Sequence, residues 1–248
     1  MTITKPTIFQ MLKSLLQADL RVQTRRARSG IMSIIVPVIV LISWKNLPGV
    51  SGAFVVGSCI TIGLMSMGLL GYSTVTAQDR AKGVFQRLRA TPAPTWIIMG
   101  SRIFAQLITI LVMAIVVIVA GYYINNIHLG LTHSVFGIIA ALFGGIAFLA
   151  LGQMLVGLVK TADAVNSAGR LIYIPLAFGG AVASLGVLGD TMKNIITWSP
   201  YGTTETILQA ALQGTNGVNH VWGSLLVTVL YAVVFAGIGI RYFQWTGE

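Results

Sequence analysis

Histidine, cysteine and carboxylate side chains are the groups that could carry catalysis or hold a metal, and this sequence has few of them. Its three histidines, His128, His133 and His220, have no carboxylate or cysteine at ligand spacing, so no metal site is expected. No HExxH motif, no paired carboxylates in an apolar run and no Ser/His/Asp set is present. The sequence therefore predicts a chain that is not itself an enzyme and that binds no cofactor.

The run GQMLVGLVKTAD, residues 152–163, is the nearest approach to a nucleotide-binding motif. A P-loop follows a strand and has its lysine directly after the second glycine. Here Lys160 and Thr161 come two residues too late, and a long apolar run precedes them. We therefore expect the chain to bind no ATP, and any energy that it uses must come from a partner.

The composition indicates an all-α integral membrane protein. Of 248 residues, 55% are hydrophobic and only 9% are charged, which is too much apolar surface for a soluble domain to bury. The net charge of +10 does not indicate nucleic-acid binding, because the cations lie at the ends of apolar runs rather than on one polar face. The single cysteine, Cys59, excludes an intrachain disulfide, and the N-terminus has no cleavable signal peptide.

Six apolar runs are long enough to cross about 30 Å of hydrocarbon as helices. With the N-terminus inside, fourteen Lys and Arg residues fall on the inner side and only Lys45 and Lys193 fall on the outer side. This distribution predicts six spans in the plasma membrane with both termini in the cytoplasm. The predicted spans are residues 29–47, 52–76, 96–124, 134–159, 169–189 and 220–243.

Two further segments are amphipathic or capped but too short to span. Residues 5–26 repeat leucines at helical spacing opposite Lys13 and Arg21, which predicts a helix lying in the inner membrane interface; a frayed basic tail is the alternative. Residues 190–214 contain Ser199–Pro200, typical of a helix start, and Gly214, typical of a helix end. We predict a re-entrant helical hairpin there, with an ordinary extracellular helix as the alternative.

The stretch AQDRAKGVFQRLRATPAPTW, residues 77–96, concentrates charge between two apolar runs. A helix over residues 78–91 would gather Ala81, Val84, Phe85 and Leu88 into one apolar stripe. The polar remainder would be available to a partner, with Asp79 at the start of the helix and arginines toward its end; it comprises Asp79, Arg80, Lys82, Gln86, Arg87 and Arg89. A basic loop that merely fixes topology is the alternative.

Polar residues are scarce inside the predicted spans. Gln153 is the clearest one at depth, and it could face a transport pathway or hydrogen-bond a neighbouring helix. No ionisable residue lies deep in a span, which argues against a proton relay or voltage sensor.

Taken together, these segments resemble the permease subunit of ABC-2 type exporters. The motif match consists of an acidic residue, a glycine, a leucine and Thr-Pro, here Asp79, Gly83, Leu88, Thr91 and Pro92. Many members carry Glu where this chain has Gln86. The segment WSPYGTTETILQAALQG, residues 198–214, is similar to the family's outer segment.

The resemblance implies that residues 78–91 form a coupling helix seated on a separate ATPase subunit, which would bind ATP and Mg²⁺. Two permeases, expected as a homodimer, would join two ATPases and enclose the substrate path, mainly along the second and fifth spans. An apolar path favours a lipid, a lipophilic drug or an amphipathic peptide. The alternatives are a stand-alone channel or secondary carrier and a non-transporting membrane immunity factor.

Overall fold

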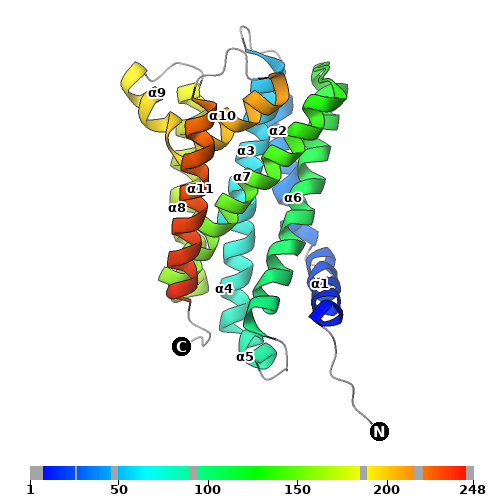
Figure 1. The fold of residues 1–248 in the computed structure, drawn as a ribbon, viewed down its shortest axis with the longest axis vertical. Coiled ribbons are helices and arrows are strands. Elements are labelled where there is room, and N and C mark those ends of the chain that lie inside the picture. Colours follow the sequence, from blue (N-terminus) through cyan, green and yellow to red (C-terminus); the bar gives the residue numbers. More distant parts are fainter. Residues whose placement is uncertain are drawn as a thin grey trace.

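The computed structural model describes residues 8–25, 27–45, 50–89, 94–184, 189–214 and 220–243, and these form helices and turns without strands. Figure 1 shows an elongated bundle with α1 and α5 at one end, here named the α5 end, and α9 and α10 at the other, the α10 end. The helices are α1 (Ile8–Arg25), α2 (Ala27–Ser43), α3 (Gly52–Met65), η1 (Ser66–Tyr72), α4 (Ser73–Ala81), α5 (Val84–Arg89), α6 (Thr95–Asn125), α7 (Leu131–Leu158), α8 (Ala162–Ser184), α9 (Gly189–Thr197), α10 (Pro200–Gln213) and α11 (Val221–Arg241).

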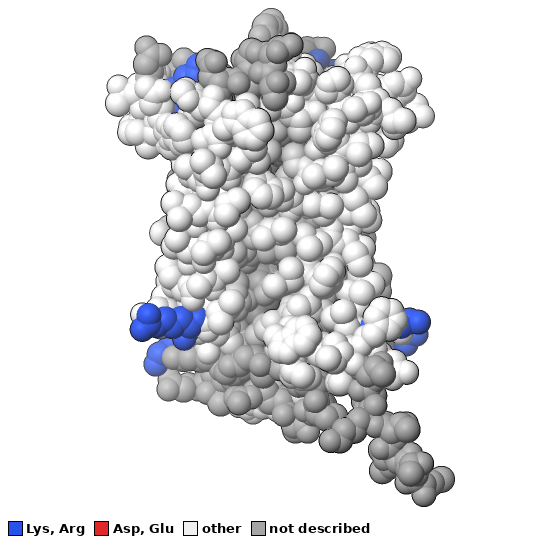
Figure 2. Space-filling view, viewed as in Figure 1, with Lys and Arg blue, Asp and Glu red and all other residues white. Residues whose placement is uncertain are grey.

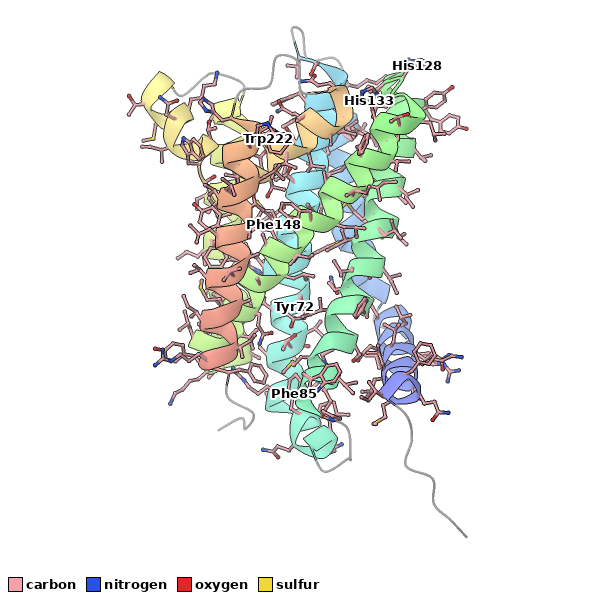
Figure 3. The ribbon with its side chains drawn as sticks, in the orientation of Figure 1. Tyr72, Phe85, His128, His133, Phe148 and Trp222 are labelled. Carbon is pink, nitrogen blue, oxygen red and sulfur yellow. The ribbon has the colours of Figure 1, made fainter. Side chains whose placement is uncertain are left out.

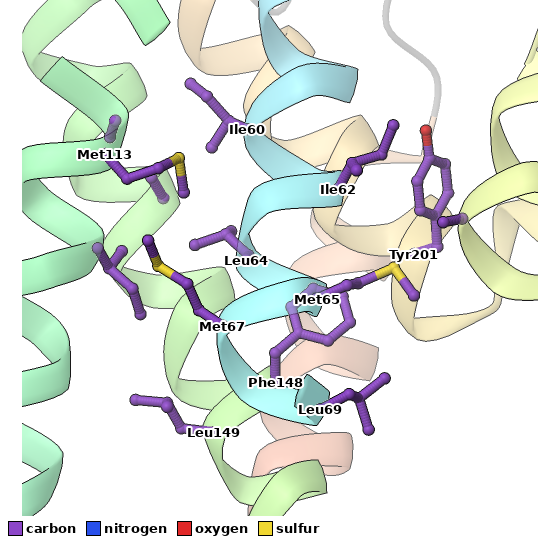
Figure 4. Close-up of a cluster of buried hydrophobic side chains, with 14 of the residues drawn as sticks. Ile60, Ile62, Leu64, Met65, Met67, Leu69, Met113, Phe148, Leu149 and Tyr201 are labelled. Carbon is purple, nitrogen blue, oxygen red and sulfur yellow. The ribbon is translucent and has the colours of Figure 1, made fainter. Parts of the chain in front are cut away.

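The centre of the bundle is one continuous helix, Gly52–Ala81, that comprises α3, η1 and α4 and is named the central helix below. It packs against α2, α6, α7, α8 and α10, so almost all of its most apolar stretch is buried within the chain. Its middle, η1, has the wider π-helical turn, which is often found at hinges and functional sites. Figure 4 shows the apolar core around it, where Met65, Met67 and Leu69 meet Phe148 and Leu149 of α7.

Four helices among the described residues are long and apolar enough to cross a membrane: the central helix, α6, α7 and α11. The other two predicted spans correspond to α2 and α8. In α2 the apolar part described is the short Ile34–Ser43, and α8 includes Arg170 and Pro175. The all-α membrane protein is confirmed, while the count of six spans stays a prediction.

The charge distribution agrees with a membrane-embedded bundle. Figure 2 shows a broad band without Lys, Arg, Asp or Glu on this face, with cations below it and a few above it. Trp222, Leu226 and Leu230 of α11 lie 80%, 73% and 58% exposed along this bundle. Such an apolar exterior is unstable in water and is stabilised by lipid.

Candidate functional site

The predicted helix 78–91 is divided in two. The central helix ends at Ala81, and α5 begins at Val84 after a turn at Lys82 and Gly83. Gly83 has φ of +68°, a left-handed conformation that glycine adopts without the steric cost of a Cβ atom. This turn redirects the chain, so Asp79 and Arg80 belong to the end of the central helix rather than to the start of a separate helix. Thr91 and Pro92 lie outside the described residues.

The short helix α5 is anchored by one aromatic side chain. Phe85 is fully buried, meets the edge of Phe243 at 5.4 Å between ring centroids, and lies 4.5 Å beneath the Arg102 guanidinium. Leu88 is half-buried, whereas Arg87 is exposed. Of the predicted apolar stripe, Phe85 packs fully on the bundle, Val84 and Leu88 do so in part, and Ala81 is exposed at the end of α4. Figure 3 places Phe85 at the α5 end of the bundle, below Tyr72.

Asp79 is buried and pairs with Arg102 of α6, with 2.9 Å between carboxylate oxygen and guanidinium nitrogen. An acidic side chain in the last turn of a helix opposes the helix dipole, so the position is unfavourable without a cation beside it. The Arg102 guanidinium supplies that cation and also covers the Phe85 ring. One arginine of α6 thus joins the end of the central helix to α5.

The prediction that Asp79 and Arg80 lie on a polar face open to a partner is wrong, because both are buried. Only 2% of Arg80 is exposed, and its guanidinium donates hydrogen bonds to the carbonyls of Val156 (2.7 Å), Val159 (2.7 Å) and Lys160. Carbonyls at the end of a helix have no partner within the helix and carry partial negative charge. Arg80 therefore caps the C-terminal end of α7. The three carbonyls that it binds lie in residues 152–163, the run compared above with a P-loop.

Polar side chains of α1 bind the start of α6. Ser101 Oγ donates to Asp19 at 2.7 Å, and Gln23 donates to Gln106 and Thr109 at 3.2 and 2.8 Å. Burial raises the pKa of Asp19, although the Ser101 hydrogen bond and nearby Arg102 oppose the rise. A cavity of about 90 Å³ lies between α1, α4 and α6, and both Asp19 and Asp79 line its wall.

Gln153 is paired with a neighbouring helix: its side-chain oxygen accepts a 2.7 Å hydrogen bond from the hydroxyl of Tyr72. This is the interhelical contact that was the alternative to a pathway role. A pathway role for Gln153 stays a prediction. Among the described residues, no three His, Cys, Asp or Glu side chains come together as metal ligands would.

At the α10 end, the capping signals predicted from the sequence are present. Ser199 caps α10 by accepting a hydrogen bond from the Gly202 amide, Pro200 opens the helix, and Gly214 ends it with φ of +90°. Glu205 of α10 is 4% exposed and accepts a hydrogen bond from Ser58 of the central helix. The polar contact between Ser58 and Glu205 was not predicted, because the two residues lie 147 positions apart.

The burial of Arg80 and the contact made by Glu205 were missed for different reasons. Arg80 and Arg87 are both arginines in one short basic stretch, and helical periodicity alone does not distinguish the buried one. The only sequence signal was Gly83, which indicates a chain reversal after Arg80. Glu205 is an isolated carboxylate in an otherwise uncharged capped segment, and that isolation was the available signal.

Comparison with known proteins is consistent with this architecture. A family model described as "ABC-2 type transporter" matches residues 10–213. A Bacillus subtilis (strain 168) protein named "Putative transport permease YvfS" is 28% identical over 181 residues, covering 69% of this chain and 72% of that protein. The matched residues run from α1 to the end of α10 and include both α5 and the capped segment at the opposite end.

Proposed function

The chain belongs to the ABC-2 type transporter family, a family of transport permeases rather than enzymes, and we propose that it is the permease subunit of an ATP-driven exporter. The observation that carries this proposal is α5. It is a short helix at one end of the bundle, anchored through Phe85 and presenting Gln86 and Arg87 to solvent (Figure 1). Such a helix can bind a cytoplasmic protein while staying attached to the membrane-embedded helices.

The partner in this proposal is an ATPase subunit, present in two copies, that binds ATP and Mg²⁺. Movement of the ATPase would act on α5 and reach the central helix through Phe85, Arg102 and Asp79, which form one set of contacts. The exposed cations of the α5 segment, Lys82 and Arg87, suit an acidic cleft on the ATPase.

The proposed orientation in the membrane places the α5 end in the cytoplasm and the α10 end outside. We place α1, α5 and the end of α11 on the cytoplasmic side of the plasma membrane, with α2 and α8 as two further spans beside the four apolar helices. In this arrangement α1 lies in the inner interface, and α9 with α10 forms a re-entrant hairpin in the outer leaflet. The exposed apolar residues of α9, such as Met192 and Ile195, suit that environment.

Two copies would form the transporter and enclose the substrate path. Because the central helix is buried within its own chain, we assign the surface for a second copy to the other span expected along the path, α8, where Leu171, Ile174 and Phe178 are exposed. An apolar wall of this kind suits a lipid, a lipophilic drug or an amphipathic peptide.

The test is binding of the ATPase by variants of α5. Lys82→Glu combined with Arg87→Glu should reduce co-purification of the ATPase, since both side chains are exposed and the fold does not depend on them. The matched control is Arg170→Glu, an equally exposed arginine on α8 that is not part of the α5 segment. Equal ATPase binding by the α5 variant and wild type would overturn the coupling role.

Orientation is tested separately in intact cells. In a Cys59→Ala background, an impermeant thiol reagent should label His133→Cys and should not label Lys82→Cys, because the two positions lie at opposite ends of the bundle. Labelling of Lys82→Cys from outside would overturn the cytoplasmic position of α5.

A further inference from the structure

The end of α4 is fixed to α7 by a rigid set of hydrogen bonds. The Nη1 atom of Arg80 donates to the Val156 carbonyl, and Nη2 donates to Val159 and Lys160. A guanidinium is planar and its donors have fixed directions, so these bonds restrict both the distance and the orientation of α4 relative to the end of α7. Val156 belongs to the last turn of α7, and Lys160 lies two positions before the start of α8. The turn between α7 and α8 is thereby attached to α4.

A second attachment lies about three turns away along the central helix, at η1. A Cβ atom on Gly68 would lie 2.3 Å from the Phe148 carbonyl oxygen, and one on Gly152 would lie 2.3 Å from the Gly68 carbonyl oxygen. Gly169 of α8 approaches the Leu69 carbonyl in the same way, at 2.5 Å. These contacts join backbone to backbone, so the π-helical segment is held against both α7 and α8.

The opposite side of α4 is attached less firmly. It contacts α6 through the Asp79–Arg102 ion pair, whose side chains are 8% and 11% exposed, and a cavity lies between α4 and α1. A single ion pair adjusts more easily than three charge-assisted bonds to backbone carbonyls.

We infer that Arg80 is a positioning residue that makes α4, the end of α7 and the start of α8 move as one body when α5 moves, while α1, on the other side of the cavity, stays behind. This inference rests on the proposed function, in which α5 receives the ATPase movement. Its consequence is that the ATPase acts on α8, which has an exposed apolar face, through the Arg80 contact.

Spin-label distances test the inference without knowledge of the substrate. In the complex with its ATPase and a Cys59→Ala background, one pair is Lys82→Cys with Asp163→Cys, both exposed and on the body that we expect to move together. The reference pair is Lys82→Cys with Lys13→Cys on α1. Between nucleotide-free and ATP-bound states, the first separation should stay constant and the second should change.

Substitution of Arg80 then separates positioning from stability. Arg80→Gln should broaden the Lys82–Asp163 distance distribution and make its mean depend on nucleotide, and Arg80→Lys should restore part of the wild-type behaviour. A merely structural role predicts lower thermal stability with an unchanged Lys82–Asp163 distribution in the folded protein. That result, or a wild-type Lys82–Asp163 separation that changes with nucleotide, would overturn the inference.

The coupling role of α5 can be contradicted without contradicting the role of Arg80. If the chain binds no ATPase, or if nucleotide changes neither separation, coupling through α5 is wrong. The nucleotide-free comparison of wild type with Arg80→Gln still decides whether Arg80 fixes α4 to the α7–α8 turn, because it needs no ATPase.

Discussion

The two ends of the central helix are held by opposite arrangements of charge. At the α5 end the helix itself carries the charges, and Asp79 and Arg80 bind an arginine of α6 and carbonyls of α7. At the α10 end the helix contributes only the neutral hydroxyl of Ser58, and the charge belongs to Glu205 of a short capped helix. The first arrangement fixes the helix to two long neighbours through charged groups, whereas the second adds a polar contact to the apolar packing of α10 on α3, α7 and α11. Force applied at the α5 end would therefore reach the bundle through charged contacts, while the α10 end is held mainly by its buried apolar side chains.

The largest effect is expected at Arg80. Arg80→Met should destabilise the protein by about 3 kcal/mol or more, because it leaves carbonyls of the α7 end without a donor in a buried site. Reversible unfolding in mixed detergent micelles measures the free-energy change. The control is Arg87→Met, which alters an exposed arginine of the same stretch and should change stability by less than about 0.5 kcal/mol.

This prediction also bears on Arg80→Glu. A carboxylate in that position would face three carbonyl oxygens, so the substitution would disturb folding as well as partner binding. Equal stability of Arg80→Met and Arg87→Met would contradict the contrast between the two ends, since Arg80 would then not fix the helix.

The middle of the central helix is the next most sensitive region. Gly152→Ala should cost about 2 kcal/mol, because its Cβ would lie 2.3 Å from the Gly68 carbonyl oxygen and a backbone atom cannot move aside. Gly179→Ala in α8 is the control, because no atom lies within 4 Å of its added Cβ. That control should be neutral or slightly stabilising, as alanine is the better helix former. Thermal unfolding of both variants in one detergent decides the comparison.

The sequence predicted the parts of this molecule that depend on local pattern. Apolar runs gave the long helices, and Ser199, Pro200 and Gly214 marked α10 at both ends because capping is decided within a few residues. The sequence did not predict that α4 continues from α3 without a break. Its polar residues Thr76 and Asp79 are buried by α6, α7 and α8, and those contacts are not visible in a local window.

The same limit applies to the candidate site. Phe85 was expected to pack on the membrane domain because it lies in the apolar stripe of residues 78–91, and its partner is Phe243. Arg80 was expected to be exposed because helical spacing places it among the polar residues outside that stripe. Its burial depends on the free carbonyls at the end of α7, 76 residues away, which exist only after the bundle has formed.

A smaller effect is expected at the α10 end. Ser58→Ala should cost about 1 to 2 kcal/mol, since it removes a donor to a buried carboxylate. In combination with Glu205→Gln, the two changes should be less than additive, which a double-mutant cycle on unfolding free energy would show. Additive effects would mean that the Ser58–Glu205 contact does not stabilise this end. A coupling as large as the Arg80 effect would remove the difference between the two ends.

The smallest effect is expected at Asp19, which lines the same cavity as the Asp79–Arg102 ion pair. Burial raises the pKa of this carboxyl above its ordinary value of 3.8, so the docked form of α1 binds a proton more readily than the undocked form. Docking is then strongest at pH values below the ordinary pKa and weakens as the pH rises through the raised pKa. Asp19→Asn keeps an acceptor for the Ser101 hydroxyl and should remove this pH dependence, with a change of less than about 0.5 kcal/mol at neutral pH. Hydrogen exchange of the α1 amides, compared between variant and wild type at each pH, measures it. If wild-type α1 exchanges faster than the variant at acidic pH and equally at neutral pH, the sign is wrong, and Arg102 rather than burial dominates the Asp19 environment.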